Sequence, residues 1–101
     1  MKAYLIDAQN QTVENVDVGS MADIAKMIGY DTVESEALGG SGDRLFFDEE
    51  CFIRGSEGRF QVDKLIPVSG KGLLMGSDEE GNALSDVNTD RNDLQNRIKF
   101  S

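Results

Sequence analysis

The apolar segments of this chain are short and separated by turn residues, and this spacing constrains the fold more than any other feature. Lys2–Ala8 and Thr12–Val18 alternate in part between apolar and polar residues, as strands with one buried face do. Gln9 and Asn10 between them predict an opening hairpin. Further strands are predicted at 32–38, 44–47 and 51–54, with apolar segments at 59–62 and 65–68. Strands that follow one another through short turns favour an α+β domain with a mostly antiparallel β-sheet over a βαβ fold.

One amphipathic helix is predicted over residues 20–28, and it is the clearest helix in the sequence. Its apolar side chains recur at i, i+3, i+4 and i+7, which places them on one face. They are Met21, Ile24, Ala25 and Ile28. Ser20 and Asp23 match a capping box, and Gly29 is a residue type that commonly ends helices. We expect this helix to cover one face of the sheet.

Two features of the remaining chain concern the core and the C-terminal end. Leu73–Met75 is short and continuous, so a fully buried central strand is predicted there. In one interpretation of the C-terminal end, Thr89 caps a short helix whose Leu94 and Ile98 point inward. In the other, residues 98–100 close the chain as an edge strand. The core is expected to contain four phenylalanines, which are Phe46, Phe47, Phe52 and Phe60.

Histidine is absent and cysteine occurs once, which excludes several classes of enzyme. Without His there is no Ser-His-Asp triad, no Cys-His pair and no facial iron triad. A zinc site built from Cys and His needs more ligands than Cys51 alone. Cys51 lies between Glu50 and Phe52, and an acidic neighbour disfavours a reactive thiolate, so a buried structural cysteine is predicted. We therefore predict a non-enzymatic protein without a cofactor.

The length and the apolar segments also predict where the protein acts. With 101 residues, the chain suits a single domain spanning residues 1–101. A lone cysteine forms no internal disulfide, so nothing favours an oxidising compartment. The first apolar run ends at Asp7, which is too short for a signal peptide, and no run approaches the roughly 20 residues of a membrane span. A cytoplasmic protein is predicted.

Gly70 and Lys71 invite comparison with a phosphate-binding loop, and the comparison fails. That motif requires a Gly five residues before its final Gly and a Ser or Thr after its Lys. Leu65 and Gly72 occupy these positions. A glycine-rich turn before a buried strand is predicted instead. A small ligand bound around Gly70–Gly72 is the alternative.

Two acidic runs, at 48–50 and 78–80, suggest a site for a hard cation. A calcium loop that begins at Asp78 has its Gly at the wrong position, and one that begins at Asn88 lacks both the Gly and the final Glu, so solvated turns and no metal site are predicted. An enzyme could also be built from Asp43 and Asp48 with Mg²⁺, because acid/base pairs need only proximity and different pKa values. Nothing in the sequence places these two carboxylates together, so this hypothesis ranks last.

The formal net charge of −9 comes mostly from the first half of the chain. Residues 1–50 carry a net charge of −8, and residues 51–101 carry −1. Phosphate groups and anionic lipids repel such a chain, so direct binding to nucleic acid or to a membrane is not expected. A basic surface on another protein is the complementary partner.

The acidic residues concentrate between positions 31 and 50, where Arg44 is the one basic residue. The predicted partner-binding residues are Asp31, Glu34, Glu36, Asp43, Asp48, Glu49 and Glu50. On a strand, Glu34 and Glu36 share a face about 6.6 Å apart. That separation is close to every second phosphate of a DNA strand, whose phosphates lie about 3.4 Å apart along the axis. The spacing predicts a surface that occupies the DNA-binding groove of a protein.

Three segments resemble a family of short bacterial and phage proteins to which no activity is assigned. They are 28–34, 42–50 with the pattern GD-x-L-x-x-DEE, and 67–81, which contains P-x-S-GKGL-x-x-G. The likeness covers most of the chain in order and spacing, and it implies no catalytic residue. By analogy with small acidic phage-type proteins, it implies an anti-defence inhibitor, including the anti-CRISPR kind. We therefore predict an inhibitor that occupies a basic nucleic-acid-binding surface of a host complex. The alternative is a small-ligand-binding or housekeeping protein.

Overall fold

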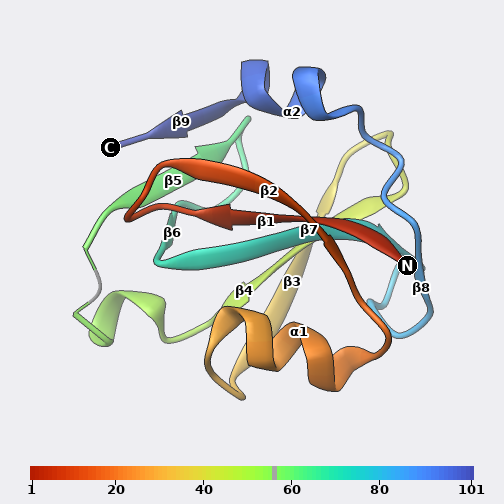
Figure 1. Cartoon of the computed structure of the whole chain (residues 1–101), viewed down its shortest axis with the longest axis horizontal. Coiled ribbons are helices and arrows are strands. Elements are labelled where there is room, and N and C mark those ends of the chain that lie inside the picture. Colours follow the sequence, from red (N-terminus) through yellow and green to blue (C-terminus); the bar gives the residue numbers. More distant parts are fainter. Residues whose placement is uncertain (56) are drawn as a thin grey trace.

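Two antiparallel β-sheets make up most of the fold (Figure 1). The computed structural model describes residues 1–55 and 57–101. The larger, six-stranded sheet has the order β2-β1-β7-β4-β3, with β8 paired to β7. Its strands are β1 (Lys2–Asp7), β2 (Thr12–Asp17), β3 (Val33–Leu38), β4 (Asp43–Asp48), β7 (Lys71–Ser77) and β8 (Leu84–Ser85). The smaller sheet has the order β6-β5-β9, with β5 (Arg59–Val62), β6 (Val68–Ser69) and β9 (Ile98–Phe100). The predicted α+β class, mostly antiparallel, is confirmed.

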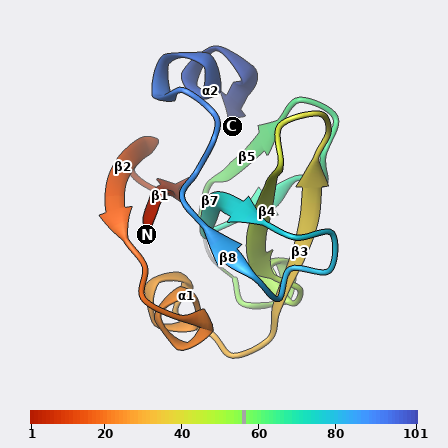
Figure 2. The ribbon, with the colours of Figure 1, turned by 90° about the vertical axis from the view of Figure 1, so that its right-hand side faces the viewer.

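The large sheet lies between two layers (Figure 2). Helix α1 (Met21–Ile28) covers one face, and the small sheet with helix α2 (Arg91–Arg97) covers the other. Successive residues of a strand point to opposite faces. Phe46 of β4 therefore belongs to the cluster under α1, whereas Leu45 and Phe47 belong to the cluster under the small sheet.

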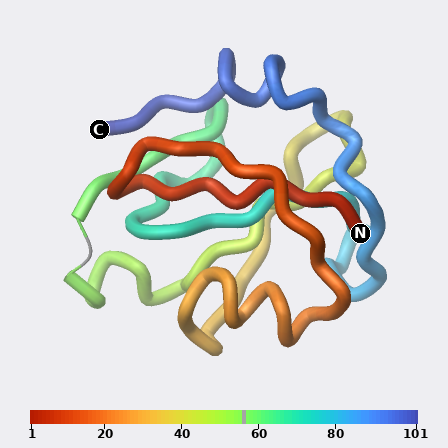
Figure 3. Tube along the Cα trace, in the orientation of Figure 1, coloured from red at the N-terminus to blue at the C-terminus, as the bar shows by residue number. Residues whose placement is uncertain are grey.

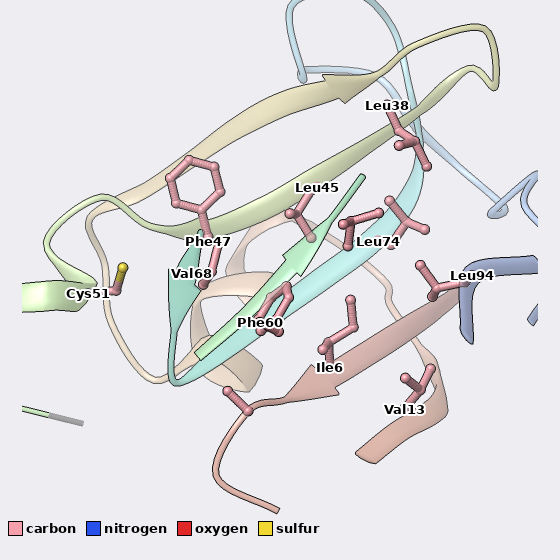
Figure 4. Packing of buried hydrophobic residues seen from close by; sticks show 12 residues of the cluster. Ile6, Val13, Leu38, Leu45, Phe47, Cys51, Phe60, Val68, Leu74 and Leu94 are labelled. Atoms are coloured by element: carbon pink, nitrogen blue, oxygen red, sulfur yellow. The ribbon is translucent and has the colours of Figure 1, made fainter. Parts of the chain in front are cut away.

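Side chains from both sheets meet in the larger cluster (Figure 4). Phe60 of β5 is 1% exposed, and its ring lies against β7 at Gly72. A Cβ atom at Gly72 would lie 2.5 Å from Phe60 Cζ, so a glycine is needed for the small sheet to approach the central strand. The predicted central strand is confirmed, because Leu73, Leu74 and Met75 of β7 are fully buried.

The predicted ends of α1 agree with the structure. The helix begins after Ser20 and ends at Gly29, whose φ of 98° lies in the left-handed region that glycine tolerates. Asp23 Oδ2 accepts a hydrogen bond from the Gly19 N–H at 2.8 Å, while the Ser20 side chain makes no capping bond. Asp23 thus reaches the residue before the N-cap, so neither hydrogen bond of the predicted capping box is formed.

The buried stripe of α1 is narrower than predicted. Ile24 and Ile28 are buried against the sheet, and Ala25 is half-buried. Met21 is 42% exposed, so it lies outside the contact with the sheet. The helix is nevertheless amphipathic and covers one face of the sheet, as expected.

The chain after β8 runs to α2 and returns beside β5 as β9 (Figure 3). Each interpretation of the C-terminal end is therefore correct in part, because a short helix is followed by an edge strand. Asp90, and not Thr89, caps α2 by accepting a hydrogen bond from the Asn92 N–H. Leu94 is buried and Ile98 is half-buried in β9. Among the residues described, no helix is long and apolar enough to cross a membrane.

The strand predicted at 51–54 is wrong. Cys51–Ile53 forms a 3₁₀ turn, η1, in which the Ile53 N–H donates to the Glu50 carbonyl at 3.0 Å. Only Cys51 of this turn is buried, so Phe52 does not join the other three phenylalanines in the core. Of the apolar segment at 65–68, only Val68 enters a strand.

Candidate functional site

The seven acidic residues predicted to bind a partner fall into two groups. Asp43 and Asp48 are 1% and 2% exposed, so their carboxylates lie in the interior. The remaining five are exposed or half-buried and are Asp31, Glu34, Glu36, Glu49 and Glu50. The structure therefore does not bring all seven to one surface. Asp43 and Asp48 also stand at opposite ends of β4, about 16 Å apart along the strand, so they do not form an acid/base pair.

Asp43 fastens the segment between β8 and α2 to the start of β4. Its Oδ1 accepts hydrogen bonds from the Asn88 N–H at 2.8 Å and the Asn88 side-chain amide at 3.0 Å. Its Oδ2 accepts from the Thr89 N–H at 2.8 Å and the Thr89 hydroxyl at 2.5 Å. Four donors satisfy this carboxylate, which makes its burial tolerable. Asp43 therefore serves the fold.

Asp48 lies at the centre of a second polar network. Its Oδ2 accepts from Arg54 Nε at 3.0 Å, and its Oδ1 accepts from the Thr32 hydroxyl and from the Glu50 N–H. Burial alone would raise the pKa of the Asp48 carboxyl, but the hydrogen bonds from Thr32 and Arg54 outweigh it and lower that pKa. Arg54 Nη2 also pairs with Glu50 at 3.2 Å. Asp48 is therefore ionised and already neutralised by Arg54.

The exposed acidic residues gather where β3 begins and β4 ends. The Glu49 N–H donates to the Thr32 carbonyl at 2.8 Å, which holds the turn after β4 against the start of β3. We call this surface the acidic edge, and it consists of Asp31, Glu34, Glu49 and Glu50. The Glu34 carboxylate is the largest cause of a raised pKa at Glu49. Within residues 1–55 and 57–101, neither Glu34 nor Glu49 forms a salt bridge.

Glu36 follows on the same strand face as Glu34. Glu34 is paired with Phe47 and Glu36 with Leu45, so their shared face agrees with the sequence prediction. Glu36 Oε2, however, accepts a hydrogen bond from the Ile66 N–H at 3.1 Å. It ties β3 to the segment before β6 and is only half-buried. Glu36 therefore borders the acidic edge and also serves the fold.

An exposed apolar turn directly follows the acidic edge in the chain. Phe52 and Ile53 of η1 are 48% and 80% exposed. The Arg59 guanidinium lies over the Phe52 ring, 5.1 Å from its centroid. Because Glu49 and Glu50 come immediately before η1, charged and apolar groups lie next to each other there.

Sequence reasoning missed the apolar turn because it assigned every phenylalanine except Phe100 to the core. A signal is nevertheless present in the residues. Cys51, Phe52 and Ile53 are consecutive apolar residues with charged residues on both sides, so the segment lacks the alternation of a half-buried strand. A run too short to cross the core and bounded by Glu50 and Arg54 is typical of a turn.

A pocket of about 290 Å³ lies beside the acidic edge. Its walls come from the end of β1, the last turn of α1, the region of η1 and the turn between β6 and β7. Cys51 lines it as a buried thiol, whose Sγ accepts a hydrogen bond from the Ser69 N–H at 3.5 Å. Gly70 and Lys71, which the sequence marked as the alternative ligand site, also line this pocket.

Searches against protein-family models, curated proteins and solved structures match nothing to this chain. The resemblance to short bacterial and phage proteins therefore stays a prediction. In the part of the chain that the structure describes, no three Cys, Asp or Glu side chains gather closely enough to hold a metal ion.

Proposed function

We propose that this protein is a non-enzymatic inhibitor that binds a basic, nucleic-acid-binding surface of another protein. The acidic edge and the apolar turn form the contact. The observation that carries this proposal is the position of Glu49 and Glu50 directly beside the exposed Phe52 and Ile53. An acidic face that serves solubility alone does not need exposed Phe and Ile side chains.

The charges of the acidic edge favour a cationic partner. Glu34 and Glu49 repel each other, as the raised pKa of Glu49 reports. Lysine and arginine side chains of a partner relieve this repulsion and lower the pKa of Glu49. Attraction of this kind gives fast association that weakens as salt concentration rises.

The apolar turn adds apolar anchor residues to the contact, which charge attraction alone does not provide. Protein interfaces commonly place an aromatic or apolar anchor in a pocket of the partner and surround it with polar and charged groups. Phe52 and Ile53 are such anchors, with Glu49 and Glu50 at their border. This combination fits a protein with a basic groove better than it fits a simple polycation.

The resemblance to short phage and bacterial proteins supplies the biological setting of the proposal. By analogy, the protein has a cytoplasmic anti-defence role, such as inhibition of a CRISPR complex, in which it competes with DNA or RNA. The partner is then a host complex whose groove binds nucleic acid.

The experiment compares two charge-reversal variants of equal net charge as baits in host lysate. The edge variant carries Asp31→Lys, Glu34→Lys and Glu49→Lys. The control variant carries Glu14→Lys, Asp17→Lys and Glu79→Lys, of which the first two lie on β2 at the opposite edge of the large sheet. Among the described residues, none of these six carboxylates forms a salt bridge, and each variant changes the net charge from −9 to −3.

The wild type and the control variant are expected to capture the same nucleic-acid-binding protein, in a manner sensitive to salt. The edge variant is expected to bind that protein about tenfold more weakly or worse. Equal loss in both variants would show that only overall charge matters. Unchanged binding by the edge variant would exclude the acidic edge as the contact.

A further inference from the structure

The pocket beside the acidic edge has a size and a wall structure that suit a small ligand. At about 290 Å³ it lies just below the range for drug-sized ligand sites, roughly 300–1,000 Å³, so it suits a compact ligand. Four separate chain segments form its walls, from β1 to the start of β7. Because strands of both sheets and α1 contribute, the pocket is fixed by the fold.

The carboxylates in the pocket wall are already engaged. Asp7 Oδ1 accepts hydrogen bonds from the N–H groups of Gln9 at 3.0 Å and Asn10 at 3.2 Å, and its Oδ2 accepts from the Asn10 side chain at 2.8 Å. Asp48 is held by Arg54 and by the other donors of its network. Both carboxylates therefore already have hydrogen-bond donors, and neither needs a bound cation.

The lysines in the same wall are unpaired. Lys26 and Lys71 line the pocket, and within residues 1–55 and 57–101 neither forms a salt bridge. Arg54, the third cation of the wall, is fixed in place by Asp48 and Glu50. In a chain of net charge −9, the pocket thus has more cationic than anionic groups in its wall.

The last turn of α1 also borders the pocket and modifies its electrostatics. A helix C-terminus presents carbonyl groups and disfavours a bound anion. The Gly29 N–H satisfies the Ala25 carbonyl at 2.8 Å, and Lys26 stands in the same last turn, where its charge opposes the helix dipole. Lys71 lies on strand β7 and not on the helix, so the helix dipole does not offset its positive charge.

We propose that this pocket binds a small anion that carries a phosphate or a carboxylate group, with Lys26 and Lys71 as its charge partners. The tightness of the pocket restricts the ligand to a compact metabolite or to the anionic group of a larger one. This site is independent of the acidic edge, so its failure would leave the proposed partner binding untouched.

The test is a titration of the ¹⁵N-labelled protein with inorganic phosphate and, separately, with succinate, followed by NMR. Saturable shifts are expected at the amide signals of Gly29, Gly70 and Lys71 with at least one of the two anions. A response to phosphate alone assigns a phosphoryl ligand, and a response to succinate alone assigns a carboxylate. The absence of saturable shifts with both anions would overturn the proposal.

A matched pair of variants separates the pocket from general charge. The Lys26→Gln, Lys71→Gln variant should bind the anion about tenfold more weakly. The control is Lys64→Gln, Lys99→Gln, which removes two lysines from a wider depression beside α2 and gives the same net charge. This control should bind like the wild type. Equal weakening in the two variants would overturn the site, and the spectra themselves show whether each variant is folded.

Discussion

At the scale of single residues, Asp43 is the carboxylate on which the C-terminal half depends most. Its four hydrogen bonds reach Asn88 and Thr89, which lie 45 and 46 residues further along the chain. The Asp43→Asn substitution keeps the shape of the side chain but places an amide group opposite two of these donors. We expect the free energy of unfolding to fall by about 3 kcal/mol.

Chemical denaturation measures this change. Glu14→Gln on the surface of β2 is the control and should stay within about 0.5 kcal/mol of the wild type. If Asp43→Asn unfolds at the same denaturant concentration as the wild type, the interior role of this carboxylate is wrong.

A second residue-scale prediction concerns Glu49. Its pKa is raised, chiefly by Glu34, so Glu34→Gln should return the pKa of Glu49 toward its ordinary value. A raised carboxyl pKa means that ionisation of Glu49 opposes folding. The favourable contribution is present below its unfolded-state pKa and is lost as pH rises through the folded-state pKa. NMR titration of the Glu49 side chain measures both proteins, and an unchanged pKa in Glu34→Gln would show that the two carboxylates do not interact.

The sequence pattern could predict which acidic residues are buried but not which groups they contact. Alternation along β4 places Asp43 on the same face as Leu45 and Phe47, so the sequence pattern indicated that Asp43 is buried. The donors that make this burial tolerable lie on a distant segment, however, and no local pattern reveals them. Asp48 differs, because its partner Arg54 is only six residues away, but their ion pair depends on the path of η1, where a strand was predicted.

At the scale of elements, the packing of β5 on β7 depends on Gly72. A methyl group at this position would meet Cζ of the buried Phe60 ring at 2.5 Å, so the ring would have to shift within the core. We expect Gly72→Ala to lower the free energy of unfolding by about 1–3 kcal/mol. Gly39→Ala is the control, since nothing lies within 4 Å of a Cβ added there. Thermal unfolding that is equal in the two variants would contradict the packing.

The apolar turn η1 gives the second prediction at this scale. Phe52→Ser with Ile53→Ser removes two exposed side chains, so the melting temperature should change little. Binding to the captured partner should weaken about tenfold or more, because interface anchors carry a large share of the binding energy. Unchanged affinity would show that the turn does not enter the interface.

Elements defined by local pattern were predicted well, and those defined by distant contacts were not. The β1–β2 hairpin and α1 have their turn and cap residues next to them in sequence, so their positions follow from local chemistry. The 51–54 segment has the composition of a strand, but its first three residues fold as a 3₁₀ turn in which the Ile53 N–H donates to the Glu50 carbonyl. The C-terminal end divides into α2 and β9 because β5 offers an open edge to residues 98–100.

At the scale of the whole molecule, the strand order β2-β1-β7-β4-β3 could not be predicted from the sequence. β7 lies between β1 and β4, although it follows both of them in the chain. This insertion brings Lys71 beside the end of β1 and so completes the pocket. The acidic edge, in contrast, is formed by the consecutive strands β3 and β4, so its residues are also close together in the sequence.

The central claim is that the acidic edge competes with nucleic acid for a basic groove. The measurement is the fluorescence anisotropy of labelled duplex DNA bound to the purified captured partner, as the present protein is added. We expect the wild type and the control variant to displace the DNA, and the edge variant to require about tenfold more protein. DNA that stays bound at saturating wild-type protein, or displacement by the edge variant equal to that by the wild type, would contradict the claim.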